Sequence, residues 1–163
     1  MKEYLKEQLE RTNYWLSFSE AKNGALVAVN VGVIAVCVQM KSVFSLVDIM
    51  VCVLFLISTL FCLLSFNPNL TNKYKCKENS GYNSELNLSF YGDIARIQNV
   101  EEYLDLVQER YHLLLDYEQM CYDLAEEVMI NSKIAIIKFN LFKRAVFIDI
   151  FAVLVLIIGI ISA

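Results

Sequence analysis

The chain has 163 residues, of which 57% are hydrophobic, 20% are charged and only one is a proline. So few turn residues argue against an all-β fold, because short strands need a turn about every 8–12 residues. The net charge of -4 excludes a strongly basic nucleic-acid-binding protein, and the high hydrophobicity excludes intrinsic disorder. The composition therefore predicts an all-α membrane protein.

The first 24 residues predict an amphipathic helix that leads into an apolar run. The residues that recur along it at helical spacing are Leu5, Leu9, Thr12 and Leu16. Four glutamates in this arm exclude a cleavable signal peptide and a mitochondrial transit peptide. Tyr14, Trp15 and Phe18 approach the first apolar run, where aromatic side chains are expected at the membrane interface.

Three apolar runs predict membrane-spanning helices, at residues 25–40, 43–66 and 145–163. The first would span about 24 Å as a helix, which is short for a hydrocarbon core of about 30 Å. We therefore expect it to continue the helix that begins in water. Only Lys41 and Ser42 separate the first two runs, so these runs predict a tight transmembrane hairpin.

The distribution of Lys and Arg predicts the orientation. Four of these residues lie in the N-terminal arm and nine in region 67–144, against one at the hairpin tip. By the positive-inside rule, the N-terminus and the middle region are cytoplasmic and the C-terminus is outside. The expected segments are a cytoplasmic amphipathic helix at 1–24, a transmembrane helical hairpin at 25–66, a cytoplasmic loop and long helix at 67–144, and a C-terminal transmembrane helix at 145–163.

The cytoplasmic middle region predicts a loop followed by one long helix. Residues 67–91 are rich in Asn and Lys, and form the stretch best suited to cover a ligand. Asn99 followed by Glu102 resembles a helix N-cap with its capping box, so the helix is expected to run from Val100 to Phe142. Its apolar stripe consists of Ile97, Val100, Leu104, Val107, Tyr111 and Leu114, then, after a shift, Tyr117, Cys121, Leu124 and Val128.

A helix of this length must pack its stripe on a partner, because it is not stable alone in water. The partner is either a second copy of the chain or the N-terminal arm. The sequence favours a homo-oligomer and leaves packing within one chain open.

Three polar residues inside the predicted spans are not explained by apolar packing: Asn30, Asp48 and Asp149. Polar groups at this depth normally find a partner or a water-filled cavity. Asn30 lies about 8 Å and Asp149 about 6 Å from the same face, so we expect them to meet. Asp48 lies about 8 Å from the opposite face, where its expected partner is Lys41. A pore role and a simple packing or headgroup-reaching role both stay open.

The sequence contains no recognisable catalytic or metal-binding motif. The five cysteines include no C-x-x-C pair, and His112 is the one histidine, which is too few ligands for a zinc or di-iron centre. Phosphate-binding glycine loops and nucleophile motifs are also missing from it. We therefore expect a protein that is not an enzyme and that binds no metal and no cofactor.

Several short motifs are similar to those of a known family. In chain order they are Ser19-Glu20-Ala21-Lys22 before an apolar helix with Asn30, Leu88-Ser89-Phe90-Tyr91-Gly92-Asp93-Ile94, Glu102-Tyr103-Leu104, Leu124-Ala125-Glu126-Glu127-Val128, and Asn131-Ser132-Lys133 with Lys138. Over residues 12–150 the chain resembles the small transmembrane effectors of Pycsar anti-phage defence. In that family the first motif usually reads Ala-Asp-x-Lys-Ala, whereas here Glu20 replaces the Asp and Asn23 follows the Lys.

The resemblance implies a multi-pass protein of the bacterial inner membrane that senses a cyclic pyrimidine nucleotide, cCMP or cUMP, made by a companion cyclase during infection. Activation would impair membrane integrity and cause growth arrest or cell death, which is abortive infection. The nearest alternatives are a SLATT-like pore-forming effector and a membrane toxin that a partner protein controls. A structural subunit without a ligand is a further alternative.

A bound nucleotide would need cations for its phosphate and an aromatic surface for its base. The cytoplasmic candidates for the phosphate are Lys22, Arg96, Arg110, Lys133 and Lys138. Tyr91 or Tyr103 is available to stack on the base. Ordinary solvated charges and ion pairs are the competing interpretation of each. The expected partners are the lipid bilayer, further copies of the chain and the cyclic nucleotide, with no nucleic acid.

Overall fold

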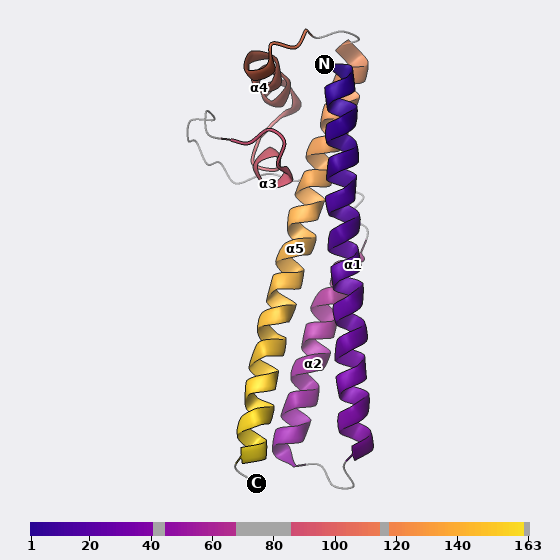
Figure 1. The fold of residues 1–163 in the computed structure, drawn as a ribbon, viewed down its shortest axis with the longest axis vertical. Coiled ribbons are helices and arrows are strands. Elements are labelled where there is room, and N and C mark those ends of the chain that lie inside the picture. Colours follow the sequence, from indigo (N-terminus) through magenta and orange to yellow (C-terminus); the bar gives the residue numbers. More distant parts are fainter. Residues whose placement is uncertain (41–44, 68–85, 115–117, 162–163) are drawn as a thin grey trace. The chain divides into compact units, whose positions relative to one another are not determined.

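A computed structural model describes residues 1–40, 45–67, 86–114 and 118–161, and all the secondary structure in these ranges is helical. The helices are α1 (Lys2–Met40), α2 (Leu46–Leu64), α3 (Tyr91–Ile94), α4 (Val100–Tyr111) and α5 (Glu118–Ile161) (Figure 1). The chain forms two compact units. Unit 1 comprises Met1–Phe18 and Asn69–Ile137, and unit 2 comprises Ser19–Pro68 and Lys138–Ala163. The all-helical prediction is confirmed.

Helix α1 joins the N-terminal arm and the first apolar run in one unbroken helix of 39 residues. The side chains that it buries recur at steps of three, four or seven residues and therefore lie on one face. They are Leu5, Gln8, Thr12, Ser19, Asn23 and Asn30. Five of these six are polar, so hydrogen bonding must contribute to the packing of this face.

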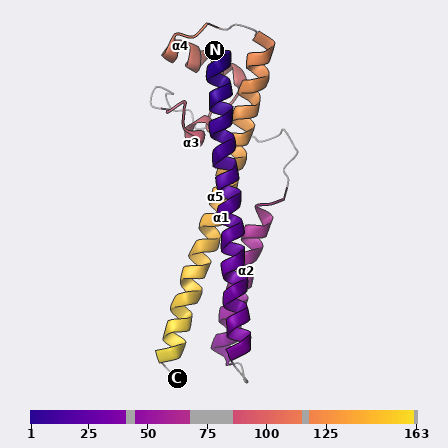
Figure 2. The same ribbon diagram turned by 45° about the vertical axis from the view of Figure 1, so that its right-hand side comes forward.

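Unit 1 has its own apolar core, formed by the first part of α1, by α3 and α4, and by the first part of α5 (Figures 1 and 2). Its fully or almost fully buried members are Leu5, Leu88, Ile94, Ile97, Tyr103, Leu104, Val107, Cys121, Ala125, Val128 and Met129. Much of the predicted stripe is therefore covered by the chain itself. The stripe gives no argument for a second copy, and the homo-oligomer stays a prediction.

The expected single helix from Val100 to Phe142 is wrong. Helix α4 ends at Tyr111, and His112 adopts the left-handed conformation with φ of 54°, which terminates a helix. Leu114, assigned to the stripe, is 75% exposed. The physical reason is tertiary: α4 and the first part of α5 bury their apolar faces in the same core, and one straight helix cannot present both faces to it. Tyr117 lies outside the described residues.

The beginning of α4 agrees with the sequence in most details. Oδ1 of Asn99 accepts a hydrogen bond from the backbone N–H of Glu102 at 2.7 Å, so the predicted N-cap is confirmed. The carboxylate of Glu102 reaches back to the N–H of Gln98, at 3.1 Å, rather than to Asn99 itself. These two hydrogen bonds together hold the first turn of α4 in place.

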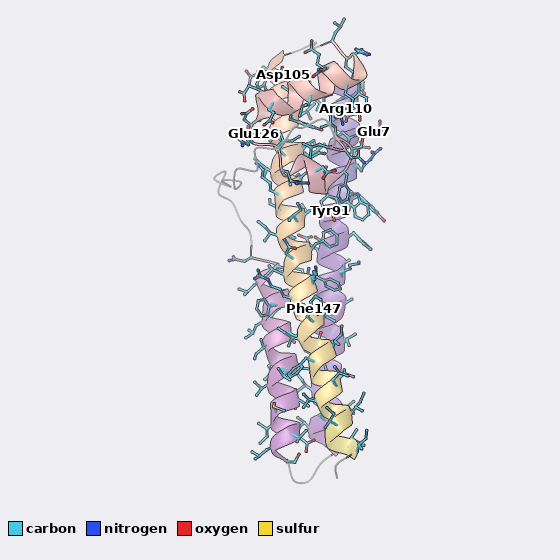
Figure 3. The ribbon with its side chains drawn as sticks, turned by 90° about the vertical axis from the view of Figure 1, so that its left-hand side faces the viewer. Glu7, Tyr91, Asp105, Arg110, Glu126 and Phe147 are labelled. Atoms are coloured by element: carbon cyan, nitrogen blue, oxygen red, sulfur yellow. The ribbon has the colours of Figure 1, made fainter. Side chains whose placement is uncertain are left out.

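Unit 2 contains α2 together with the second part of α1 and the remainder of α5, and α2 packs against both (Figure 1). Three helices are long and apolar enough to cross a membrane, as judged by length and composition. Many large apolar side chains in this unit are exposed. Phe147, for example, is 62% exposed on α5 (Figure 3). Such a surface is what lipid contact requires.

Asp48 belongs to the first turn of α2. The hydroxyl of Ser45 accepts a hydrogen bond from the N–H of Asp48 at 3.2 Å, and the Asp48 carboxylate accepts one from the N–H of Ser45 at 3.0 Å. This is a capping box, which satisfies two backbone donors at once. The expected partner Lys41 lies outside the described residues.

Gly159 marks a close approach of α5 to α2. A Cβ at Gly159 would lie 2.7 Å from Cγ1 of Val47, whose branched side chain is stiff. A Cβ at Gly32 on α1 would meet nothing within 4 Å. Small residues at helix contacts inside membranes permit such close packing.

We predict that Gly159→Leu destabilises the protein by about 1–3 kcal/mol through overpacking against Val47. This would lower the melting temperature of the detergent-solubilised protein by about 2–4 °C per kcal/mol. Gly32→Leu is the matched control and should change the melting temperature much less. Equal melting of the two variants would contradict the packing assigned to Gly159.

Candidate functional site

The seven residues proposed to contact a nucleotide are divided between the two units. Lys22 and Lys138 belong to unit 2. The other five belong to unit 1, and they are Tyr91, Arg96, Tyr103, Arg110 and Lys133. The two groups are therefore described separately.

Aromatic side chains from two distant segments gather on unit 1. The ring of Tyr91, at the start of α3, lies 5.5 Å from that of Trp15 on α1 and 4.7 Å from that of Phe90 (Figure 3). On α1, Tyr14 and Phe18 stack at 6.2 Å. We call these five residues the aromatic face. Tyr14 is 63% exposed and Phe90 is 42% exposed, so the face is accessible.

The segment that holds Tyr91 is built by its own motif. Oδ1 of Asn87 accepts a hydrogen bond from the N–H of Ser89, and Oδ2 of Asp93 accepts one from the N–H of Asn87, both at 3.0 Å. These two bonds close the turn before α3. A Cβ at Gly92 would collide with the ring of Phe90, which explains a glycine after the aromatic pair.

Arg96 follows α3 and is the exposed cation of this segment. Its Nη1 lies 3.6 Å from Oδ1 of Asp93, and its side chain is 61% exposed. An exposed ion pair of this kind contributes little to stability, so the guanidinium can exchange one partner for another at low cost. Arg96 lies five residues after Tyr91, so the aromatic pair and the cation belong to one short segment.

The other candidates of unit 1 have different surroundings. Arg110, in the last turn of α4, donates a hydrogen bond to the carbonyl of Leu86. Lys133 is partly exposed on α5. Tyr103 is completely buried in the core, and burial raises the pKa of its hydroxyl. In this conformation Tyr91, and not Tyr103, offers a ring at the surface.

Unit 1 also carries an acidic groove, a hollow of about 720 Å³. Its lining residues are Glu3, Tyr4, Lys6, Glu7, Glu10, Tyr111 and Leu113. Three carboxylates and one ammonium group line the groove. Lys6 pairs with Glu3 at 3.4 Å, and Arg11 pairs with Glu7 at 3.2 Å. Glu10 is the carboxylate of the lining that has no ion pair among the described residues. The acidic groove therefore suits a cationic group and repels a phosphate.

In unit 2, Lys138 connects three helices. It is only 8% exposed, and its Nζ donates hydrogen bonds to the carbonyl of Ser65 at 2.6 Å and to the Glu20 carboxylate at 2.9 Å. Lys22 lies 5.5 Å from the ring centre of Phe142, a cation–π contact. The residues of the first family-like motif thus make contacts between helices.

Asn23 on α1 also contacts another helix, α5. Its side-chain amide donates to the carbonyl of Ser19 at 2.8 Å and is 3.4 Å from that of Lys138. Because Glu20 reaches the Lys138 ammonium, the carboxylate that stands in place of the usual Asp has a defined partner in this chain.

Deeper in unit 2, three polar residues from three helices form a cluster. The amide nitrogen of Asn30 donates to the hydroxyl of Ser58 at 2.9 Å, and that hydroxyl donates to the carbonyl of Ala145 at 3.2 Å. Asp149, one turn after Ala145, lies close to Ser58 and Asn30. The sequence indicated Asn30 and Asp149 but missed Ser58, which looked like an ordinary hydroxyl residue within an apolar run.

Comparisons with known proteins identify the family. A family model described as the Pycsar effector protein domain matches residues 4–163, nearly the whole chain and both units. The chain belongs to this family. A search of curated proteins and a search of solved structures gave no match. Family membership, with three candidate spans, makes this protein a Pycsar anti-phage membrane effector, a kind of protein that is generally not an enzyme.

Two tyrosines of this Pycsar effector tie its stability to pH. Burial raises the pKa of Tyr4 from 10.0 to about 12, and burial raises that of Tyr103 as well. A folded-state pKa above the unfolded value means that the neutral hydroxyl stabilises the fold at every pH below about 10. That contribution is lost as the pH rises from 10 toward the folded-state pKa.

We therefore predict that the melting temperature falls between pH 9 and pH 11, and falls less in Tyr103→Phe. Near neutral pH this variant should melt within about 2 °C of the wild type, because the Tyr103 hydroxyl has no hydrogen-bond partner in the part of the chain that the structure describes. Tyr14→Phe, at an exposed position, is the control. An identical alkaline loss in all three proteins would contradict the assignment.

Proposed function

We propose that this Pycsar effector is activated by a cyclic pyrimidine nucleotide, cCMP or cUMP, and then impairs the integrity of the bacterial inner membrane, which causes growth arrest or cell death. The observation that carries the proposal is the family match over residues 4–163. The division of the chain supports it, because unit 2 has the apolar surface for a bilayer and unit 1 has an accessible surface for a ligand.

The aromatic face with Arg96 is the nucleotide site that we propose within unit 1. Bases stack on aromatic rings with about 1–3 kcal/mol per base, and Tyr91, Phe90 and Trp15 are grouped for such stacking. The exposed guanidinium of Arg96 supplies a charge-assisted hydrogen bond for the phosphate. The acidic groove is a poor alternative for the same ligand, because its carboxylates repel the phosphate.

Two helices offer a physical route from ligand to membrane. Both α1 and α5 contribute residues to unit 1 and to unit 2 without a break. A nucleotide that binds one arrangement of these helices better than another would shift the population toward it. We propose a homo-oligomer as the assembly in which this shift acts on the bilayer.

A membrane toxin controlled by a partner protein, or a SLATT-like pore-forming effector, is the second candidate function. The acidic groove favours control by a partner protein, since Glu3, Glu7 and Glu10 would attract a basic segment of that partner. In this case the cyclic nucleotide would not bind the chain.

Isothermal titration of cCMP and cUMP into the detergent-solubilised full chain separates the two candidates. We expect binding of at least one of them and weakening by roughly 10–100-fold in Arg96→Ala, the loss of one charge-assisted hydrogen bond. Tyr91→Ala should weaken binding as well. Lys6→Ala, which removes an exposed cation outside the aromatic face, is the control. Heat of binding for neither nucleotide would contradict the proposal and favour the partner-controlled toxin.

We propose that the N-terminus and unit 1 are cytoplasmic and that the C-terminus is outside. The support is that 13 of the 14 basic residues fall on the predicted cytoplasmic side. A green fluorescent protein fused after Ala163 should then stay dark, because it folds poorly outside the cytoplasm, whereas the same reporter before Met1 should fluoresce. A fluorescent C-terminal fusion at comparable expression would reverse this orientation.

A further inference from the structure

The cluster of Asn30, Ser58 and Asp149 has more hydrogen-bond acceptors than donors. The Asn30 amide nitrogen donates one of its two N–H groups to the Ser58 hydroxyl, and the Ser58 hydroxyl proton is used by the Ala145 carbonyl. Oδ1 of Asn30 and both carboxylate oxygens of Asp149 are buried and have no hydrogen-bond partner among the residues that the structure describes. These three oxygens lie in low-dielectric surroundings, where a positively charged group would be needed to balance them.

Two lysines in the described part of unit 2 already have other partners. Lys138 is bound to Ser65 and Glu20, and Lys143 lies 6.0 Å from the ring centre of Phe147. The buried thiol of Cys62 is a further titratable side chain near Asp149, and a thiol carries no positive charge.

The hollow beside Asp149 gives no donor either. It measures about 280 Å³, and apart from Asp149 it is lined by Leu26, Val146, Ile150, Val153 and Leu154. An unpaired carboxylate in such surroundings costs several kcal/mol.

We propose that Asn30, Ser58 and Asp149 form a binding site for a monovalent metal cation such as Na⁺. The oxygens present are a carboxylate, an amide carbonyl and a hydroxyl, and hard cations prefer such ligands. One positive charge balances the single carboxylate, whereas a divalent ion would leave an excess charge inside the bilayer. A proton on Asp149 would supply one donor, which can reach one other oxygen of the cluster, Oδ1 of Asn30. A metal cation would instead be coordinated by a carboxylate oxygen, the Asn30 amide oxygen and the Ser58 hydroxyl oxygen together.

The site would join three helices, since Asn30 lies on α1, Ser58 on α2 and Asp149 on α5. The bound cation would stabilise the packed arrangement of the three candidate spans. This inference holds whether or not a nucleotide activates the protein, so its failure and that of the proposed function are distinguishable.

Thermal unfolding of the full chain in detergent tests the site, with equal concentrations of NaCl, KCl or choline chloride at fixed pH and without nucleotide. We expect the alkali salts to raise the melting temperature over choline chloride. At a hundredfold excess of Na⁺ over its dissociation constant the rise should be about 5 °C or more. Asp149→Asn keeps the shape of the side chain and should lose the shift.

Thr59→Val is the matched control, because Thr59 is the next residue along α2 and its hydroxyl bonds to the Phe55 carbonyl, away from the cluster. This variant should keep the full shift. If Asp149→Asn does not fold, Ser58→Ala removes one ligand, keeps the carboxylate and should weaken the dependence on Na⁺. Equal melting of the wild type in all three salts overturns the proposal. So does a shift that persists in Asp149→Asn, or one that follows pH and not the alkali cation.

Discussion

In the part of the chain that has the surface for lipid, apolar burial cannot decide how the helices pack, because hydrocarbon tails are as apolar as leucine. Unit 2 has a buried apolar cluster of Val51, Phe55 and Ala152, but the contacts that specify how its helices face one another are accordingly polar or made at small residues. Asn30 bonds to Ser58, Lys138 bonds to Ser65 and Glu20, and Gly159 allows α5 to approach Val47 closely. Each of these contacts fixes a rotational position of a helix, which a uniform apolar surface leaves undefined. The arrangement of unit 2 depends on this small set.

Two of the five family-like motifs, Ser19–Lys22 and Leu88–Ile94, have a common physical role. In the first, Glu20 and Lys22 contact groups on α5, and Ser19 is buried. In the second, Asp93 and the glycine that accommodates Phe90 hold a turn that sets Tyr91 beside Trp15. Both motifs therefore specify position. In unit 1, Arg96 and the aromatic face lie on or beside the turn that the second motif makes.

The sequence was sufficient for features that depend on local patterns. Apolar runs predicted the three candidate spans, and Asn99 with Glu102 predicted the start of α4. It was insufficient where tertiary packing decides. No glycine or proline marks the end of α4 at His112, so the break between α4 and α5 had no local signal. The pairing of Trp15 with Tyr91 and of Asn30 with Ser58 joins segments far apart in the chain, which periodicity cannot detect.

The capped ends of α2 have a consequence for bilayers of different thickness. Its 19 residues extend about 28 Å, close to the depth of a hydrocarbon core. At its first turn the Ser45 and Asp48 side chains satisfy backbone donors, and at its last turn the N–H and the hydroxyl of Ser65 both bond to the Cys62 carbonyl. The helix therefore brings its own partners for end groups that headgroup water would otherwise have to solvate. It can meet a locally thinned bilayer without exposing these polar groups to hydrocarbon.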